Sequence, residues 1–130
     1  MADIVQNIPA YPATALQTIT AATGTAATLT LAAPAAGLFH YITLLEIMQY
    51  YTAANAALAA PIVVTSTNIT GAPAWSQDGQ LGVVGKAFYS TYNYGHPGIK
   101  CTTAATATTI VAPLLVGVIW RISAAFYVAP

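Results

Sequence analysis

The chain has 130 residues, a length that fits one domain around a single hydrophobic core. Only 5% of its residues are charged, against about 25% in an ordinary soluble domain, and the net charge is zero. Three scattered basic residues cannot neutralise a run of phosphates, which argues against a nucleic-acid partner. Net charge also keeps protein surfaces apart, so its absence predicts a homo-oligomer in which other subunits cover much of the surface.

The N-terminal segment, residues 1–13, has no basic region and is interrupted by Pro9 and Pro12. This pattern is unlike a secretory signal and predicts an extended arm, followed by one β-domain over residues 14–130. An extended arm can lie along a neighbouring protein. Its apolar side chains are therefore candidate contact residues: Ile4, Val5, Ile8 and Tyr11.

Two alternating segments follow the arm, residues 14–20 and 27–33. Alternation of apolar and polar residues predicts β-strands, and the 18 threonines of the chain suit half-buried strand surfaces. Gly24 lies between the two segments, where a turn is predicted. We therefore expect these strands to form a hairpin.

The next segment, residues 39–51, fits both a helix and a strand. Tyr41, Leu44 and Met48 would share one helix face, and the alanines of residues 52–60 would extend the helix. Against a helix, the segment has no good N-cap, and its first residues are rich in aromatic and β-branched side chains. We predict a strand followed by an irregular alanine-rich connection.

The rest of the chain has the pattern of short strands separated by turns. Strands are predicted over residues 60–69, 86–94, 99–104, 106–112 and 114–128, with a long loop over residues 70–82. About eight short strands predict an all-β fold, a single β-sandwich or jelly roll with an extended N-terminal arm. The last strand stays apolar almost to the C-terminus, so we expect it to be an interior strand of the sandwich.

The most apolar window, residues 104–120, approaches the length of a membrane span. Pro113, Gly117 and several threonines interrupt it, which disfavours a membrane helix. We expect no membrane partner.

Three stretches resemble a known family: "AAPAAGLFHYITLLEI" (32–47), "APIVVTSTNITGAPAW" (60–75) and "TTIVAPLLVGVIWRISAAFYV" (108–128). They are similar to the small β-sandwich cement or decoration proteins of tailed bacteriophage capsids, and the resemblance covers about the last 100 residues. It implies a jelly-roll-like subunit, dimeric or trimeric, on the outer capsid surface of the virion. The implied partner is the major capsid protein, and the family defines no catalytic residues.

The chain holds no constellation typical of catalysis. Its three acidic residues are isolated from one another, and none of its serines lies in a Gly-x-Ser-x-Gly motif. His40, His96 and Cys101 lack the spacing of metal ligands. We therefore predict no enzyme activity, no cofactor and no metal site.

The stretch "FYSTYNYGH" (88–96) is rich in aromatic residues, and Trp75 lies in the loop before it. The candidates from this region are Trp75, Tyr89, Tyr92 and Tyr94. Aromatic side chains of this kind anchor protein interfaces, and they also stack on sugars. We expect them, with Arg121, to serve contacts between proteins, since Arg121 in an apolar strand needs a partner group.

Composition and resemblance together favour a non-enzymatic phage virion protein that binds the capsid exterior and ties major capsid proteins together. The alternative is a carbohydrate-binding or host-attachment module of a fibre or spike, in which Trp75 and the tyrosines bind sugar. A membrane-associated protein is the least favoured of the three.

Overall fold

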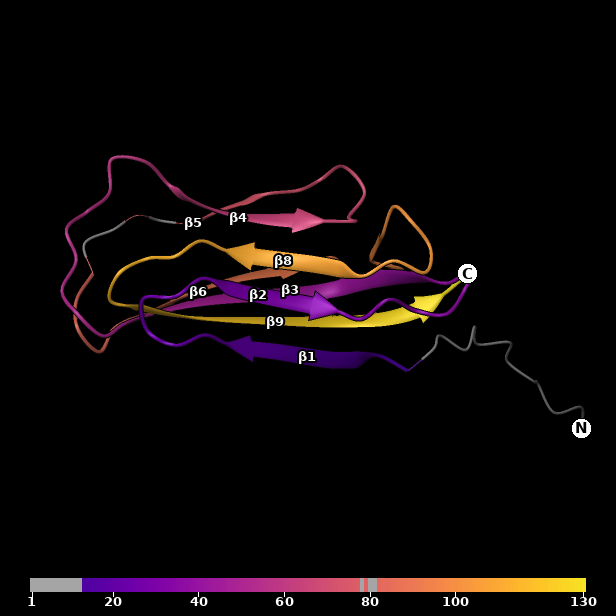
Figure 1. Cartoon of the computed structure of the whole chain (residues 1–130), viewed down its shortest axis with the longest axis horizontal. Helices are drawn as coiled ribbons and strands as arrows, with labels where there is room; N and C mark the ends of the chain where they lie inside the picture. Colours follow the sequence, from indigo (N-terminus) through magenta and orange to yellow (C-terminus); the bar gives the residue numbers. More distant parts are fainter. Residues whose placement is uncertain (1–12, 78, 80–81) are drawn as a thin grey trace, which may run out of the picture.

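The computed structural model describes residues 13–77, 79 and 82–130, which form two antiparallel β-sheets packed face to face (Figure 1). The strands are β1 (Ala15–Thr20), β2 (Ala27–Leu31), β3 (Phe39–Tyr51), β4 (Ile62–Thr67), β5 (Trp75–Gln77), β6 (Ala87–Asn93), β7 (Ile99–Lys100), β8 (Thr108–Ala112) and β9 (Val118–Ala129). The part of the chain that the structure describes contains no helix, and thus none that could cross a membrane. The predicted all-β sandwich is confirmed.

The strand order of the two sheets follows a nested pairing. One sheet has the order β1-β9-β3-β6, with β7 beside β3, and the other has the order β2-β8-β4-β5. Thus β1 pairs with β9, β2 with β8, β3 with β6 and β4 with β5. A long antiparallel hairpin that rolls up around a core has this order, which is the topology of a jelly roll.

The predicted hairpin of residues 14–20 and 27–33 is wrong, because β1 and β2 lie in different sheets. The amides of Ala21 and Gly24 donate to the carbonyls of Trp120 and Val118, each over 2.9 Å. These bonds hold residues 21–24 beside the first residues of β9. From there the chain crosses to the second sheet, where it forms β2. Strand alternation and a glycine turn look the same in sequence whether two strands pair in one sheet or pack across a sandwich.

The strand prediction for residues 39–51 is confirmed by β3, which pairs with β6, β7 and β9. The strand predicted over residues 114–128 begins later, at Val118, and the predicted loop over residues 70–82 contains the short strand β5. β9 lies between β1 and β3, which makes it an interior strand as expected.

The core lies between the sheets and is made by alternate residues of each strand. In β9, Trp120 and Ile122 are fully buried, whereas Arg121 lies on the outer face of the sheet. The largest fully buried side chains are Trp120, Tyr51, Leu29, Leu31, Ile42, Leu45, Ile47, Ile110 and Ile122. Their burial supplies most of the driving force for folding.

One imidazole lies inside this core. His40 Nε2 lies 2.9 Å from the Ala32 carbonyl, and Nδ1 lies 2.9 Å from the Thr108 hydroxyl. The neutral ring, which donates from Nε2 and accepts at Nδ1, satisfies both contacts. Burial lowers the pKa of His40, because the charged form loses its hydration. His40 is therefore explained as a structural residue.

Candidate functional site: an apolar loop end

Exposed apolar side chains concentrate at one end of the sandwich. The connections 21–26, 52–61, 82–86 and 113–117 meet there, at the left of Figure 1. Five of the ten large hydrophobic side chains exposed in the described residues belong to these connections, with 47% to 71% of their surface exposed. We call these five residues the loop end: Leu58, Val83, Val84, Leu114 and Val116.

The backbone of residues 113–117 is held in place by hydrogen bonds to its carbonyl groups. The Pro113 carbonyl accepts from Trp120 Nε1 over 2.9 Å, and the Gly117 carbonyl accepts from the Thr52 amide over 2.8 Å. The Val116 carbonyl accepts from Asn55 Nδ2 over 2.6 Å. With the carbonyls pointing inward, the side chains of Leu114 and Val116 are left in solvent.

A tight turn presents the second pair of apolar side chains. The Lys86 amide donates to the Val83 carbonyl over 3.0 Å, and Gly85 has φ of +79°. A positive φ at the third position is typical of a type II turn and favours glycine. The Gly85 amide also donates to the Tyr51 carbonyl over 2.9 Å, which fixes the turn to the end of β3. Val83 and Val84 therefore project from an ordered turn.

Asn55 joins three connections of the loop end. Its backbone exchanges two hydrogen bonds with Gly82, over 3.1 and 2.9 Å, and its side chain holds the Val116 carbonyl. Close approach depends on glycine at two positions: a Cβ at residue 82 would overlap the Tyr51 ring, and a Cβ at residue 117 would lie 2.9 Å from that of Ala53. The connections that bear the exposed side chains are thus fixed to one another by hydrogen bonds and close backbone packing.

A pocket of about 380 Å³ opens between two of these connections. It is lined by Tyr51, Asn55, Ala56, Leu58, Leu114, Leu115 and Val116. Among the lining residues, only Tyr51 and Asn55 have polar side-chain groups. Such a pocket suits the large apolar side chain of a protein partner, the usual anchor at the centre of an interface.

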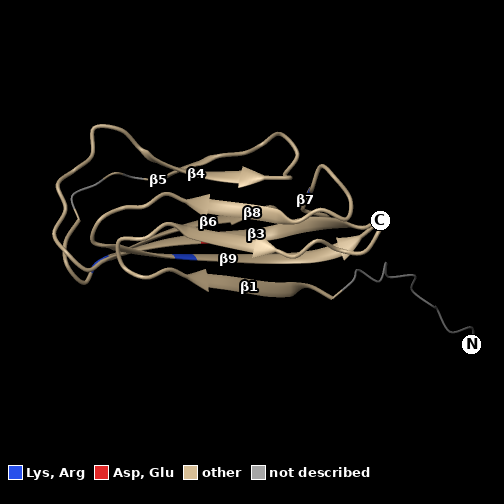
Figure 2. Ribbon diagram, viewed as in Figure 1, with Lys and Arg blue, Asp and Glu red and all other residues tan. Residues whose placement is uncertain are grey.

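Charge is sparse over the described residues, as Figure 2 shows. The described residues include four charged side chains, Glu46, Lys86, Lys100 and Arg121. Lys100 Nζ lies 4.1 Å from the centre of the Phe39 ring. Lys100 belongs to β7, which lies near the end of the sandwich opposite the loop end (Figure 2). Among the described residues, only Lys86 brings a charge to the loop end, so a partner there would meet mainly apolar atoms.

The structure separates the aromatic residues that the sequence singled out. Trp75 is 6% exposed and packs in the core, where its Nε1 donates to the Tyr94 hydroxyl over 2.8 Å. Tyr92 and Tyr94 are half-buried and also pack against the core. Tyr89 is 59% exposed on the outer face of β6. These four rings do not form one surface, and the Trp75 ring offers no face to a ligand.

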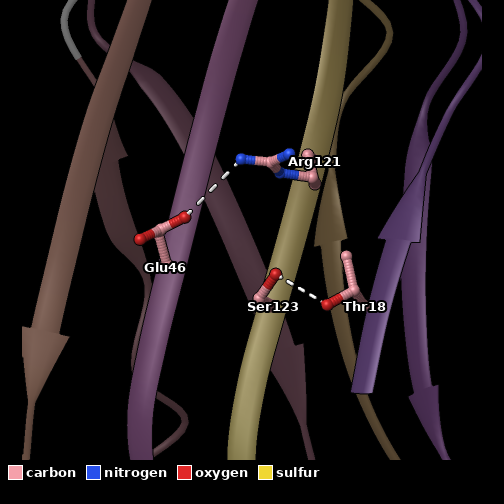
Figure 3. Close-up of polar contacts among 4 residues, drawn as sticks. All are labelled: Thr18, Glu46, Arg121 and Ser123. Carbon is pink, nitrogen blue, oxygen red and sulfur yellow. Dashed lines mark hydrogen bonds and ion pairs between the residues drawn. The ribbon is translucent and has the colours of Figure 1, made fainter. Parts of the chain in front are cut away.

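Arg121 lies on the outer face of the sheet made by β1, β9, β3 and β6 (Figure 3). Its Nη2 is 3.9 Å from Glu46 Oε1, and both side chains are more than one third exposed. Beside it, the hydroxyls of Thr18 and Ser123 lie 2.9 Å apart. Glu46 of the same chain is thus one partner of Arg121, and the expected contact of Arg121 with another protein stays a prediction.

The remaining candidates give no further site. Ile4, Val5, Ile8 and Tyr11 lie outside the described residues. No cluster of three metal-ligating side chains occurs within residues 13–77, 79 and 82–130. Cys101 is buried, and burial raises the pKa of its thiol, so it resembles a small core residue.

Comparison with known proteins does not extend these findings: no family model, curated protein or solved structure matches this chain.

Sequence reasoning missed the loop end. A usable signal was present in "GVVG" (82–85) and "PLLVG" (113–117), where apolar residues lie between turn-forming glycines and prolines. Several apolar residues grouped in neighbouring turns form an exposed patch, and such patches are typical of interaction surfaces. In "PLLVG" the apolar run adjoins β9, so the pattern alone predicts a longer strand there.

Proposed function

We propose that this chain is a non-enzymatic structural subunit of a phage virion, which binds the outer capsid surface and stabilises contacts between major capsid proteins. The observation that carries the proposal is the loop end, an apolar, weakly charged surface on a hydrogen-bonded frame. A preordered surface loses little conformational entropy on binding, so more of the contact energy appears as affinity.

Two further observations support a structural role. The jelly roll is a recurrent fold of viral capsid proteins, although the fold also carries lectins and enzymes. The sequence resembles capsid decoration proteins over about its last 100 residues. Repetition over a shell would also strengthen weak single contacts through multivalency.

The deciding experiment is quantitative mass spectrometry and cryo-electron microscopy of particles from the virus that encodes the chain. We expect many copies per particle, with the loop end against the capsid. Particles without the chain, or with a few copies at the tail, would contradict the proposal.

A variant pair tests the surface itself. Val116→Asp places a charge in the loop end and should lower the affinity for undecorated capsids at least tenfold. Ala36→Asp makes the same change of charge at an exposed position of the connection between β2 and β3, which lies at the opposite end of the sandwich (Figure 1), and should bind normally. Equal binding by the two variants would exclude the loop end as the contact surface.

One observation favours sugar binding as a second candidate. A pocket of about 340 Å³ beside β5 and β6 is lined by Gln49, Pro61, Ser76, Gln77, Phe88, Tyr89 and Ser90. It combines amide and hydroxyl groups with the exposed Tyr89 ring, a mixture that suits a sugar. Specific hits on a glycan array that disappear in Tyr89→Ala would favour a host-attachment module over a capsid subunit.

A further inference from the structure

β1 is an edge strand whose outer side has no partner among the described residues. It pairs with β9 alone, and all six of its residues are exposed. Its sequence, ALQTIT, contains no charge and no proline, and its register with β9 is unbroken. Natural edge strands are normally protected by lysine, proline, a bulge or a cover, because a free edge templates pairing with another chain.

The other four edge strands are shorter, less exposed or partly engaged. β5 has only three residues and β7 only two. In β2, the Thr30 carbonyl accepts a hydrogen bond from Gln17 Nε2 over 2.7 Å. β6 begins beside Lys86, and four of its seven residues are partly buried, whereas every residue of β1 is exposed. Within the described residues, β1 is therefore the edge most open to another strand.

The hydrogen-bonding pattern identifies which β1 groups are free. The Ala21 amide donates to the Trp120 carbonyl, so the backbone of residue 21 faces β9. Since successive residues of a strand alternate, Ala15, Gln17 and Ile19 also face β9. Leu16, Thr18 and Thr20 thus point their N–H and C=O groups to the open side.

We infer that β1 pairs with β1 of a second copy of this chain, antiparallel and about a two-fold axis at Thr18. In this register Thr18 lies opposite Thr18 of the second copy, and Leu16 lies opposite Thr20. Every open N–H and C=O of the three residues then has a partner. The outer faces of both copies stay on the same side, so the two sheets become one continuous sheet.

The side chains agree with this arrangement. β1 carries no charge, so two copies meet without repulsion, and Leu16, which is 70% exposed, gains a cross-strand neighbour in Thr20. The inference is independent of the proposed function, because a chain that dimerises through β1 need not bind a capsid, and capsid binding through the loop end does not need a dimer.

Sedimentation of the full chain and two matched lysine variants tests the surface. We expect the wild type to be a dimer. Thr18→Lys places two like charges opposite each other and should raise the dimer dissociation constant at least tenfold. Thr91→Lys, on the exposed face of the opposite edge strand β6, should remain dimeric. A monomeric wild type, or a dimeric Thr18→Lys protein, would overturn the inference.

Cysteine cross-linking tests the register. Hydrogen-bonded partners have Cα atoms about 5.5 Å apart, within disulfide range, so Thr18→Cys should form a covalent dimer under mild oxidation. Leu16→Cys should not, because its two copies lie four residues, about 14 Å, apart along the strands. The wild type contains only the buried Cys101, so it should form no covalent dimer and serves as the control. Equal cross-linking at positions 16 and 18, or none at 18 in a protein that melts like the wild type, would also overturn the inference.

Discussion

Trp120 packs in the core and is hydrogen-bonded to the connection 113–117 of the loop end. Trp120→Phe should therefore lower the stability of the fold and loosen this connection. Its ring is fully buried, and its Nε1 donates to the Pro113 carbonyl over 2.9 Å. Phenylalanine loses that hydrogen bond, worth about 1 kcal/mol, and leaves a cavity that costs about 1–2 kcal/mol more. For a 130-residue domain the sum of about 2–3 kcal/mol lowers the melting temperature by roughly 7–11 °C.

Trp75→Phe is the matched control. Trp75 is also buried, and its indole N–H donates to the Tyr94 hydroxyl over 2.8 Å. Because Trp75 lies in β5, this hydrogen bond does not hold residues 113–117. Both variants should melt at lower temperature by similar amounts. Only Trp120→Phe should speed hydrogen exchange at the amides of Thr52 and Val118, which donate to the Gly117 and Leu115 carbonyls. Exchange is measured by mass spectrometry at the same number of degrees below each variant's melting temperature.

Two results would refute this reasoning. A Trp120→Phe protein that melts within about 1 °C of the wild type would show that the bond to Pro113 and the packing of the larger ring add nothing. Faster exchange at the Thr52 and Val118 amides in both variants would show that residues 113–117 respond to general destabilisation, and that Trp120 does not hold them.

Three further predictions concern single residues. The pKa of His40 is lowered in the folded state, so its contribution to stability is full above pH 6.5 and is lost as the pH falls below that value. The free energy of unfolding, measured with urea, should therefore be lower at pH 5 than at pH 7.5. The decrease should be smaller in His40→Gln than in the wild type. Gly82→Ala drives a methyl group into the Tyr51 ring and should cost about 1–3 kcal/mol in thermal unfolding, whereas a wild-type melting temperature would exclude the clash. Arg121→Ala breaks an exposed ion pair worth about 0–1 kcal/mol, so it should keep its fold by circular dichroism and melt within about 4 °C of the wild type.

The strands could be predicted from sequence where local chemistry decides the outcome. Residues 39–51 have a helical period in their apolar residues, but their aromatic and β-branched side chains favour a strand, and β3 bears this out. The apolar character of β9 similarly indicated an interior position, since alternate residues must be buried from end to end.

Arrangement between strands could not be predicted, because it depends on contacts far apart in the chain. The turn at Gly24 marks a change of direction but does not tell whether the next strand stays in the same sheet. Burial of Trp75 depends on β5 pairing with β4, a three-residue match that leaves little trace in the sequence. An apolar residue at a contact surface, such as Leu114, also looks the same as one in the core.

The two proposed surfaces have a geometric consequence when taken together. β1 strands that pair antiparallel point their sandwiches in opposite directions, so the loop ends of a dimer lie at its two far ends. Such a dimer cannot place both loop ends on one partner molecule, but it can bridge two neighbouring partners, which is what a cementing subunit must do. Bridging makes the second contact intramolecular and raises the apparent affinity well above that of one site. Thr18→Lys should therefore weaken binding to intact capsids at least tenfold while leaving the affinity for an isolated capsid protein unchanged. An equal loss of affinity for intact capsids and for the isolated capsid protein would mean that β1 itself touches the partner. No loss of affinity for either target would mean that each subunit binds alone.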